Sequence, residues 1–105
     1  MKNMFSGSYS IKLIDLSYLN ASSVTNMEGM FKDCYALTSI NFDNFNTSSK
    51  ITNMKSMFQY CYSLRTIYLS YLDVSSITNM ENMFMHNYQL ISVNLSNFNL
   101  SSVII

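Results

Sequence analysis

The sequence predicts an α/β solenoid in which about four units, each a short helix followed by a short strand, stack side by side along 105 residues. Equivalent phenylalanines are separated by 26, 27 and 26 residues, at Phe5, Phe31, Phe58 and Phe84. A fixed period of this length is typical of stacked repeats. We therefore predict one repeat domain, 1–105, with units 1 to 4 at approximately 3–24, 25–51, 52–77 and 78–103.

The first half of each unit has the apolar spacing of a helix. In unit 2, apolar residues lie at i, i+3, i+4 and i+7 counted from Met27, which would place them on one helix face. Thr25 and Glu28 have the T-x-x-E spacing of a capping box, so we expect the helix to begin there. A helix of two turns is unstable alone, and stacked neighbours would have to stabilise it.

The second half of each unit has the alternation of a strand. Ile40-x-Phe42 and Ile67-x-Leu69 place apolar residues on one face and polar residues on the other. Strands of neighbouring units would pair about 4.8 Å apart, whereas packed helices need about 8–10 Å. The strands should therefore form a parallel sheet on the concave side of the array.

The outward positions of this predicted concave face are the candidate binding site. Tyrosine is favoured at interfaces because its ring is apolar and its tip is polar, so Tyr68 and Tyr71 would form an aromatic platform with polar edges. The alternative is a strand face that is only solvated. The candidate residues are Asp15, Ser17, Asn41, Asp43, Tyr68, Ser70, Tyr71, Asn94 and Ser96.

The composition narrows the class of partner. Six basic and six acidic side chains leave no net charge, which argues against binding the phosphates of a nucleic acid. Ser, Thr and Asn contribute 37 residues, and this uncharged polar surface suits hydrogen bonds to sugars or other uncharged partners. No apolar run reaches the roughly 20 residues that span a bilayer, so we expect no membrane insertion.

The sequence predicts no catalytic residue, no cofactor and no metal. Cys34 and Cys61 occupy equivalent positions, and a disulfide or a shared metal is the alternative to buried core thiols. Ser8 and Asn87 stand at the same position in the other two units, which favours core thiols. His86 has no carboxylate or further ligand at a matching spacing, so we expect a surface histidine and a protein that is not an enzyme.

Two further polar columns recur once per unit. The asparagines after the predicted helix start could form a stacked amide ladder that satisfies backbone groups, or could contact a partner. The tyrosines after the cysteine position could stack on one another or bind. These columns are Asn26, Asn53 and Asn79, and Tyr9, Tyr35, Tyr62 and Tyr88.

The pattern L-x-x-I-x-L-x-x-F joined to V-T-N-M-x-x-M-F-x-x-C closely resembles a known family. The segments SSITNMENMF (75–84) and NLSNFNLSSV (94–103) match its repeats almost letter for letter. The chain resembles the BspA-like leucine-rich repeat surface proteins, in the variety with repeats of about 26 residues that was noted as a mycoplasma domain of unknown function. The resemblance covers nearly all of the chain. It implies a leucine-rich-repeat-type fold, a location at the cell surface or outside the cell, a role in adhesion, and no catalytic residues.

We therefore predict a non-enzymatic repeat scaffold from a cell-surface or secreted protein, whose concave strand face recognises a host or neighbouring-cell protein or glycan. The alternative is a structural spacer, or a stalk that self-assembles end to end without a specific ligand. The chain begins inside a unit, stops before the next helix, and shows no terminal cap, secretion signal or anchor. We therefore expect a segment of a longer array.

Overall fold

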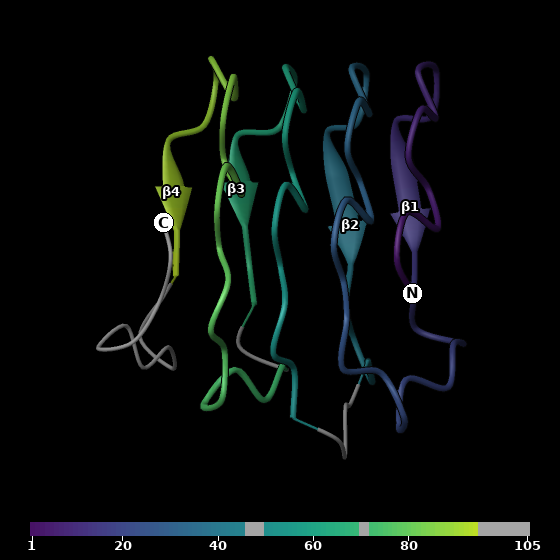
Figure 1. Cartoon of the computed structure of the whole chain (residues 1–105). Coiled ribbons are helices and arrows are strands. Elements are labelled where there is room, and N and C mark those ends of the chain that lie inside the picture. Colours follow the sequence, from purple (N-terminus) through teal and green to yellow (C-terminus); the bar gives the residue numbers. More distant parts are fainter. Residues whose placement is uncertain (46–49, 70–71, 95–105) are drawn as a thin grey trace.

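The computed structural model describes residues 1–45, 50–69 and 72–94. One short strand falls in each predicted unit, and Figure 1 shows the four strands side by side in sequence order. The strands are β1 (Leu13–Asp15), β2 (Ser39–Asn41), β3 (Thr66–Ile67) and β4 (Ser92–Val93).

The strands form two separate parallel pairs and no single sheet. Strand β1 pairs with β2 and places Ile14 opposite Ile40, while β3 pairs with β4 and places Ile67 opposite Val93. No pairing joins β2 to β3. The predicted continuous parallel sheet is therefore wrong, although strands of neighbouring units do run parallel within each pair.

The predicted helices are also wrong, because four-residue turns occupy their place and the described ranges contain no helix. In unit 2, the Met30 N–H donates to the Met27 carbonyl and the Cys34 N–H donates to the Phe31 carbonyl, each at 3.2 Å. The third residue of each turn has a positive φ, +60° at Gly29 and +62° at Asp33. Residues of a right-handed helix all have negative φ, so no helix can pass through these positions.

The same pair of left-handed residues recurs in every unit. Glycine adopts this conformation without strain, and Asn and Asp adopt it more readily than other side chains do. The first position of the pair is filled by Asn3, Gly29, Ser56 and Asn82, and the second by Gly7, Asp33, Tyr60 and His86. The turns are thus a property of the repeat.

Backbone hydrogen bonds between units explain why turns replace helices. Alternate amides of unit 2 donate to carbonyls of unit 3, for example Gly29 N–H to Lys55 O at 2.8 Å and Phe31 N–H to Met57 O at 2.9 Å. In a helix these amides would donate within their own segment, to the residue four earlier. We call this part of the molecule the turn side and the opposite part the strand side; the turn side comprises 1–9, 27–37, 54–64 and 80–90.

This bonding also removes the argument for a concave strand face. The expected curvature required helices about 8–10 Å apart on one side of the array. On the turn side, backbone groups of neighbouring units instead approach to hydrogen-bond distance, as on a strand side. The predicted α/β leucine-rich-repeat-type solenoid, with its concave parallel sheet, is therefore wrong.

The core lies between the turn side and the strand side and runs through all four units. The predicted inward face is confirmed, since Met27, Phe31 and Cys34 are fully buried. The equivalent phenylalanine rings stack on one another with centroids 5.7, 5.4 and 6.0 Å apart, in the order Phe5, Phe31, Phe58 and Phe84. The described residues include no helix that could span a membrane.

The amide ladder is confirmed and replaces the predicted capping box. The Oδ1 atoms of Asn26, Asn53 and Asn79 each accept the backbone N–H two residues later at 2.9 Å. The three asparagines also pair with one another as parallel bridges. The neighbouring threonine acts between units instead of capping a helix, because the Thr52 hydroxyl donates to the Thr25 carbonyl at 3.3 Å.

A first prediction concerns the phenylalanine stack. Phe58→Ala removes a fully buried ring that contacts rings on both sides, and should lower the free energy of unfolding by about 3–5 kcal/mol. Urea titration followed by circular dichroism measures the loss. The control, Tyr18→Ala, changes a side chain that is almost fully exposed and should leave the midpoint unchanged. Equal losses in both variants would contradict the core assignment.

A second prediction separates the turns from the helices that the sequence pattern suggested. Asn82 is exposed and has a φ of +56°. Asn82→Ala should destabilise the fold by about 1 kcal/mol, because a side chain with a Cβ but no local hydrogen bond disfavours this conformation. In a helix the same change would stabilise, since alanine has the highest helix propensity. Asn82→Gly is the control and should retain the stability of the native chain.

Candidate binding face on the strand side

Four candidate residues form one row across the strand side. Asp15 and Asn41 end β1 and β2 and are register partners, while Tyr68 and Asn94 directly follow β3 and β4. Asp15, Tyr68 and Asn94 are exposed and Asn41 is half-buried. Two residues further along lie the predicted Ser17 and Asp43, and the predicted Ser70, Tyr71 and Ser96 lie outside the described residues.

Polar side chains of this row bind the backbone just after their own strands. The Asp15 carboxylate accepts the Ser17 N–H at 2.9 Å, and the Asn41 Oδ1 accepts the Asp43 N–H at 2.9 Å. Hydrogen bonds from the Ser17 side chain and backbone lower the pKa of Asp15 below its ordinary value. These oxygens therefore fix the local backbone, and a partner would meet mainly the exposed tyrosine ring.

A small cleft opens where the sheet is interrupted. It has a volume of about 60 Å³, lies between β2 and β3, and has Tyr68 in its lining. This volume exceeds the about 10–15 Å³ that one water needs, so the cleft has room for a few waters or one small chemical group. The lining residues are Thr38, Ser39, Ile40, Phe42, Thr66, Ile67 and Tyr68.

The turn side keeps the two units together beneath this cleft. The amides of Met27, Gly29, Phe31 and Asp33 donate to unit 3 at 2.8–2.9 Å across the same boundary. The units separate only on the strand side. The one extra residue in the repeat, which makes the second interval 27, falls between Phe45 and Ile51 and so connects β2 to the next unit.

The cysteines are core thiols, as predicted. The Cys34 Sγ donates to the Phe5 carbonyl at 3.3 Å and the Cys61 Sγ donates to the Phe31 carbonyl at 3.0 Å. Burial raises the pKa of Cys34 to about 11 and that of Cys61 to about 12, so both stay protonated near neutral pH. A buried, protonated thiol is a poor nucleophile and a poor metal ligand.

The single histidine packs among tyrosines on the turn side. The His86 ring stacks on Tyr60 with centroids 4.8 Å apart, and its Nδ1 lies 2.8 Å from the Tyr88 hydroxyl. The predicted surface histidine is thus half-buried between rings. Among the residues described, no group of three or more His, Cys, Asp or Glu could hold a metal ion.

The predicted tyrosine column is a stack of neighbours. Its rings lie 5.0, 5.0 and 5.5 Å apart from Tyr9 through Tyr35 and Tyr62 to Tyr88. Tyr35 and Tyr62 have a neighbouring ring on each face, whereas Tyr9 and Tyr88, at the two ends, are 58% and 74% exposed. Stacking therefore accounts for this column without a ligand.

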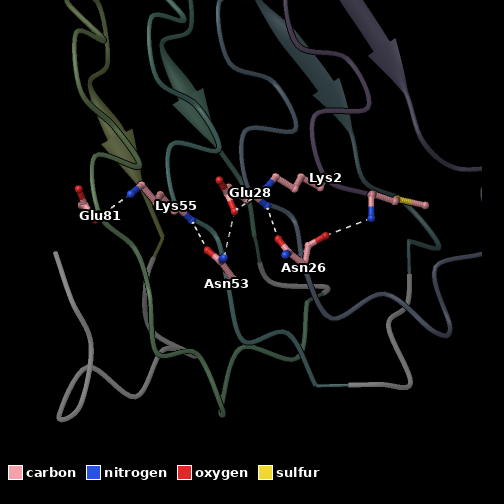
Figure 2. Close-up of polar contacts among 7 residues, drawn as sticks. Lys2, Asn26, Glu28, Asn53, Lys55 and Glu81 are labelled. Atoms are coloured by element: carbon pink, nitrogen blue, oxygen red, sulfur yellow. Dashed lines mark hydrogen bonds and ion pairs between the residues drawn. The ribbon is translucent and has the colours of Figure 1, made fainter.

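Sequence reasoning missed a row of alternating charges on the turn side. Lys2, Glu28, Lys55 and Glu81 occupy equivalent positions, and we call them the charge row (Figure 2). The Lys2 Nζ lies 3.4 Å from the Glu28 carboxylate, and the Lys55 Nζ lies 3.1 Å from the Glu81 carboxylate. The Asn53 side chain donates to the Glu28 carboxylate at 3.3 Å and accepts the backbone N–H of Lys55 at 2.9 Å. The repeat alignment alone could have revealed this alternation.

These features define a repeat protein whose units are joined by backbone hydrogen bonds and whose strand side exposes an aromatic side chain, Tyr68, among polar residues. A family model described as "Mycoplasma protein of unknown function, DUF285" matches residues 1–70 and again 35–105. The two matches together cover the whole chain, so the protein belongs to this family. No match was found among curated proteins or among solved structures.

A third prediction follows from the buried thiols. At pH 8 an ordinary thiol with a pKa of 9.0 is partly ionised, whereas Cys61, with a pKa of about 12, is not. A disulfide reagent that releases a coloured product should therefore react with these thiols far more slowly in the native protein than in concentrated urea. Cys34→Ser and Cys61→Ser separate the two sites. Rapid modification of either thiol in the native state would contradict its burial.

Proposed function

We propose that this protein is a non-catalytic binding module, and that its strand side holds an uncharged region of a protein or glycan from a host or neighbouring cell. The observation that carries the proposal is the cleft between β2 and β3 with Tyr68 at its edge. Tyr68 is 66% exposed, although it lies among side chains that line a cavity. A large aromatic residue exposed beside a cavity is a common anchor of binding sites.

The chemistry around the cleft favours an uncharged partner. Hydroxyl groups from Ser39 and Thr66 stand beside the apolar side chains of Ile40 and Ile67. A sugar, or a polar protein side chain, offers both hydrogen-bonding groups and carbon surface, and so matches this mixture. Typical pockets for small-molecule ligands measure about 300–1,000 Å³. The partner would therefore insert one small group and lie across the surface with the rest.

The resemblance of the sequence to a known family supports a cellular location for the protein. The repeats resemble those of the BspA-like surface proteins in 75–84 and 94–103. This resemblance supports display at the cell surface or outside the cell and a role in adhesion. The likeness belongs to the sequence and supports the proposal only by association.

A fourth prediction tests the strand side directly. The 105-residue chain is applied to a printed panel of neutral oligosaccharides and purified host surface proteins, and its affinity for each captured probe is measured. Tyr68→Ala combined with Asn94→Ala should weaken binding by about tenfold or more, the effect of removing an interface anchor. Circular dichroism should show that this variant keeps the native fold, because both side chains are exposed.

Tyr88→Ala is the matched control. It removes a tyrosine that is 74% exposed, but on the turn side. This variant should keep the affinity of the native chain for the same probe. The proposal fails if no probe binds, or if Tyr88→Ala and the strand-side variant weaken binding equally.

A further inference from the structure

We propose that the cleft between β2 and β3 binds the acetamido group of an N-acetylated sugar, and that the Tyr68 ring packs against the sugar ring. This inference rests on the proposed function and deepens it, because it names the chemical group that enters the cleft and the class of glycan that carries it. Three properties of the cleft lead to it: unpaired backbone groups, walls without charge, and an exposed aromatic ring.

Strands β2 and β3 lie side by side without pairing, which leaves backbone groups of β2 directed toward the cleft (Figure 1). Successive residues of a strand direct their N–H and C=O groups to opposite edges. The Ser39 N–H donates to the Lys12 carbonyl at 3.2 Å and so faces unit 1. The Asn41 carbonyl accepts the Leu16 N–H at 2.9 Å and faces the same way. Ile40 lies between these two residues, so its N–H and C=O face β3.

The opposite edge of the cleft is unpaired in the same way. The Arg65 carbonyl accepts the Ser92 N–H at 3.2 Å, so Arg65 and, two residues later, Ile67 face unit 4. Thr66 and Tyr68 alternate with them and direct their backbone groups toward β2. Within the described ranges, no hydrogen bond joins these groups to β2. The cleft therefore presents backbone donors and acceptors from both strands, and a ligand can bind them without breaking a bond of the fold.

These backbone groups match an amide. In a continuous sheet, the N–H and C=O of Ile40 would pair with peptide groups of β3. An amide offers the same acceptor and donor as a peptide group, on separate atoms, whereas a hydroxyl offers both from one atom. A whole strand does not fit, because it needs about 4.8 Å on each side. The cleft, with a volume of about 60 Å³, instead accommodates one small group.

The walls of the cleft exclude charge and favour a methyl group. None of the side chains that line it is charged at neutral pH, and enclosing a charge without a partner is strongly unfavourable. Ile40 and Ile67 add apolar surface to the lining. An acetamido group combines an amide with a methyl group, so it can bond to the backbone and contact the isoleucines together. The side-chain amides of asparagine and glutamine lack this methyl group.

The exposed ring of Tyr68 favours a sugar as the carrier of the acetamido group. Tyr68 is 66% exposed and forms part of the lining. Its ring offers an apolar face to the C–H groups of a sugar, and its hydroxyl can bond to a sugar hydroxyl. Because the acetamido group is attached directly to the sugar ring, a ring that rests on Tyr68 can place this group in the adjacent cleft.

Matched trisaccharides test the chemical group. Triacetylchitotriose carries an acetamido group on each ring where cellotriose carries a hydroxyl. Calorimetric titration of the native 105-residue chain should show at least about tenfold higher affinity for triacetylchitotriose, because cellotriose leaves enclosed backbone groups unpaired. Equal affinities would overturn the inference. A blocked glycine–glutamine–glycine peptide is the third probe, and binding of this peptide as tightly as the acetylated sugar would also overturn it.

A pair of leucine variants tests the position of the site. Thr66→Leu removes a hydroxyl from the lining and adds a larger side chain, which should lower the affinity for triacetylchitotriose about tenfold. Unit 1 carries an exposed leucine, Leu13, at the equivalent position, so the fold tolerates this change. Ser92→Leu alters the register partner of Thr66 in β4, away from the cleft, and should keep the native affinity. Equal losses in both variants would contradict the assignment.

Backbone amide signals provide a readout that is independent of the variants. In nitrogen–proton correlation spectra, the amide of Ile40 should shift when triacetylchitotriose is added. The amide of Ile14 should not shift, because Ile14 pairs within the β1–β2 ladder. An unchanged Ile40 signal at saturation would overturn the inference. If triacetylchitotriose does not bind but another neutral probe binds through Tyr68, this inference fails and the proposed function stands; if no probe binds, both fail.

Discussion

The fold depends on backbone hydrogen bonds that run from one unit to the next on the turn side. On the turn side each unit holds two residues in the left-handed region, and each such residue other than glycine costs about 1–2 kcal/mol. Four amides of unit 2 donate to carbonyls of unit 3, and each bond contributes about 1 kcal/mol net. The turns are thus stabilised by neighbours, and a single unit would lack the partners that hold its backbone. The stacked phenylalanines and the asparagine ladder also run from unit to unit and strengthen the contacts between neighbouring units.

This constraint also explains where a binding site can form. The turn side uses its backbone groups between units and stacks its tyrosine rings on one another, so these groups are already engaged. The strand side is joined less completely, because β2 and β3 do not pair. The cleft beside Tyr68 exists because the turn side already holds units 2 and 3 together and lets the strands separate.

Sequence reasoning could predict the repeat, the buried face and the row that carries Tyr68, because these depend on spacing alone. It failed on the helices because four-residue turns placed end to end give the same i, i+3, i+4, i+7 spacing of inward residues. The signal for turns is weak: glycine marks left-handed positions only at Gly7 and Gly29, while Ser56 and Tyr60 give no warning. The cleft could not be predicted. It exists because β2 and β3 do not pair, whereas the repeat pattern predicts that they do.

The charge row has a consequence for how an array of this type can lengthen. Duplication of one unit would set two lysines or two glutamates at adjacent positions, with like charges where Lys55 and Glu81 now lie 3.1 Å apart. Duplication of a pair of units keeps the alternation of lysine and glutamate along the charge row. An array of this type would therefore lengthen most favourably by two units at a time, one with lysine and one with glutamate at this position. The backbone itself repeats with every single unit.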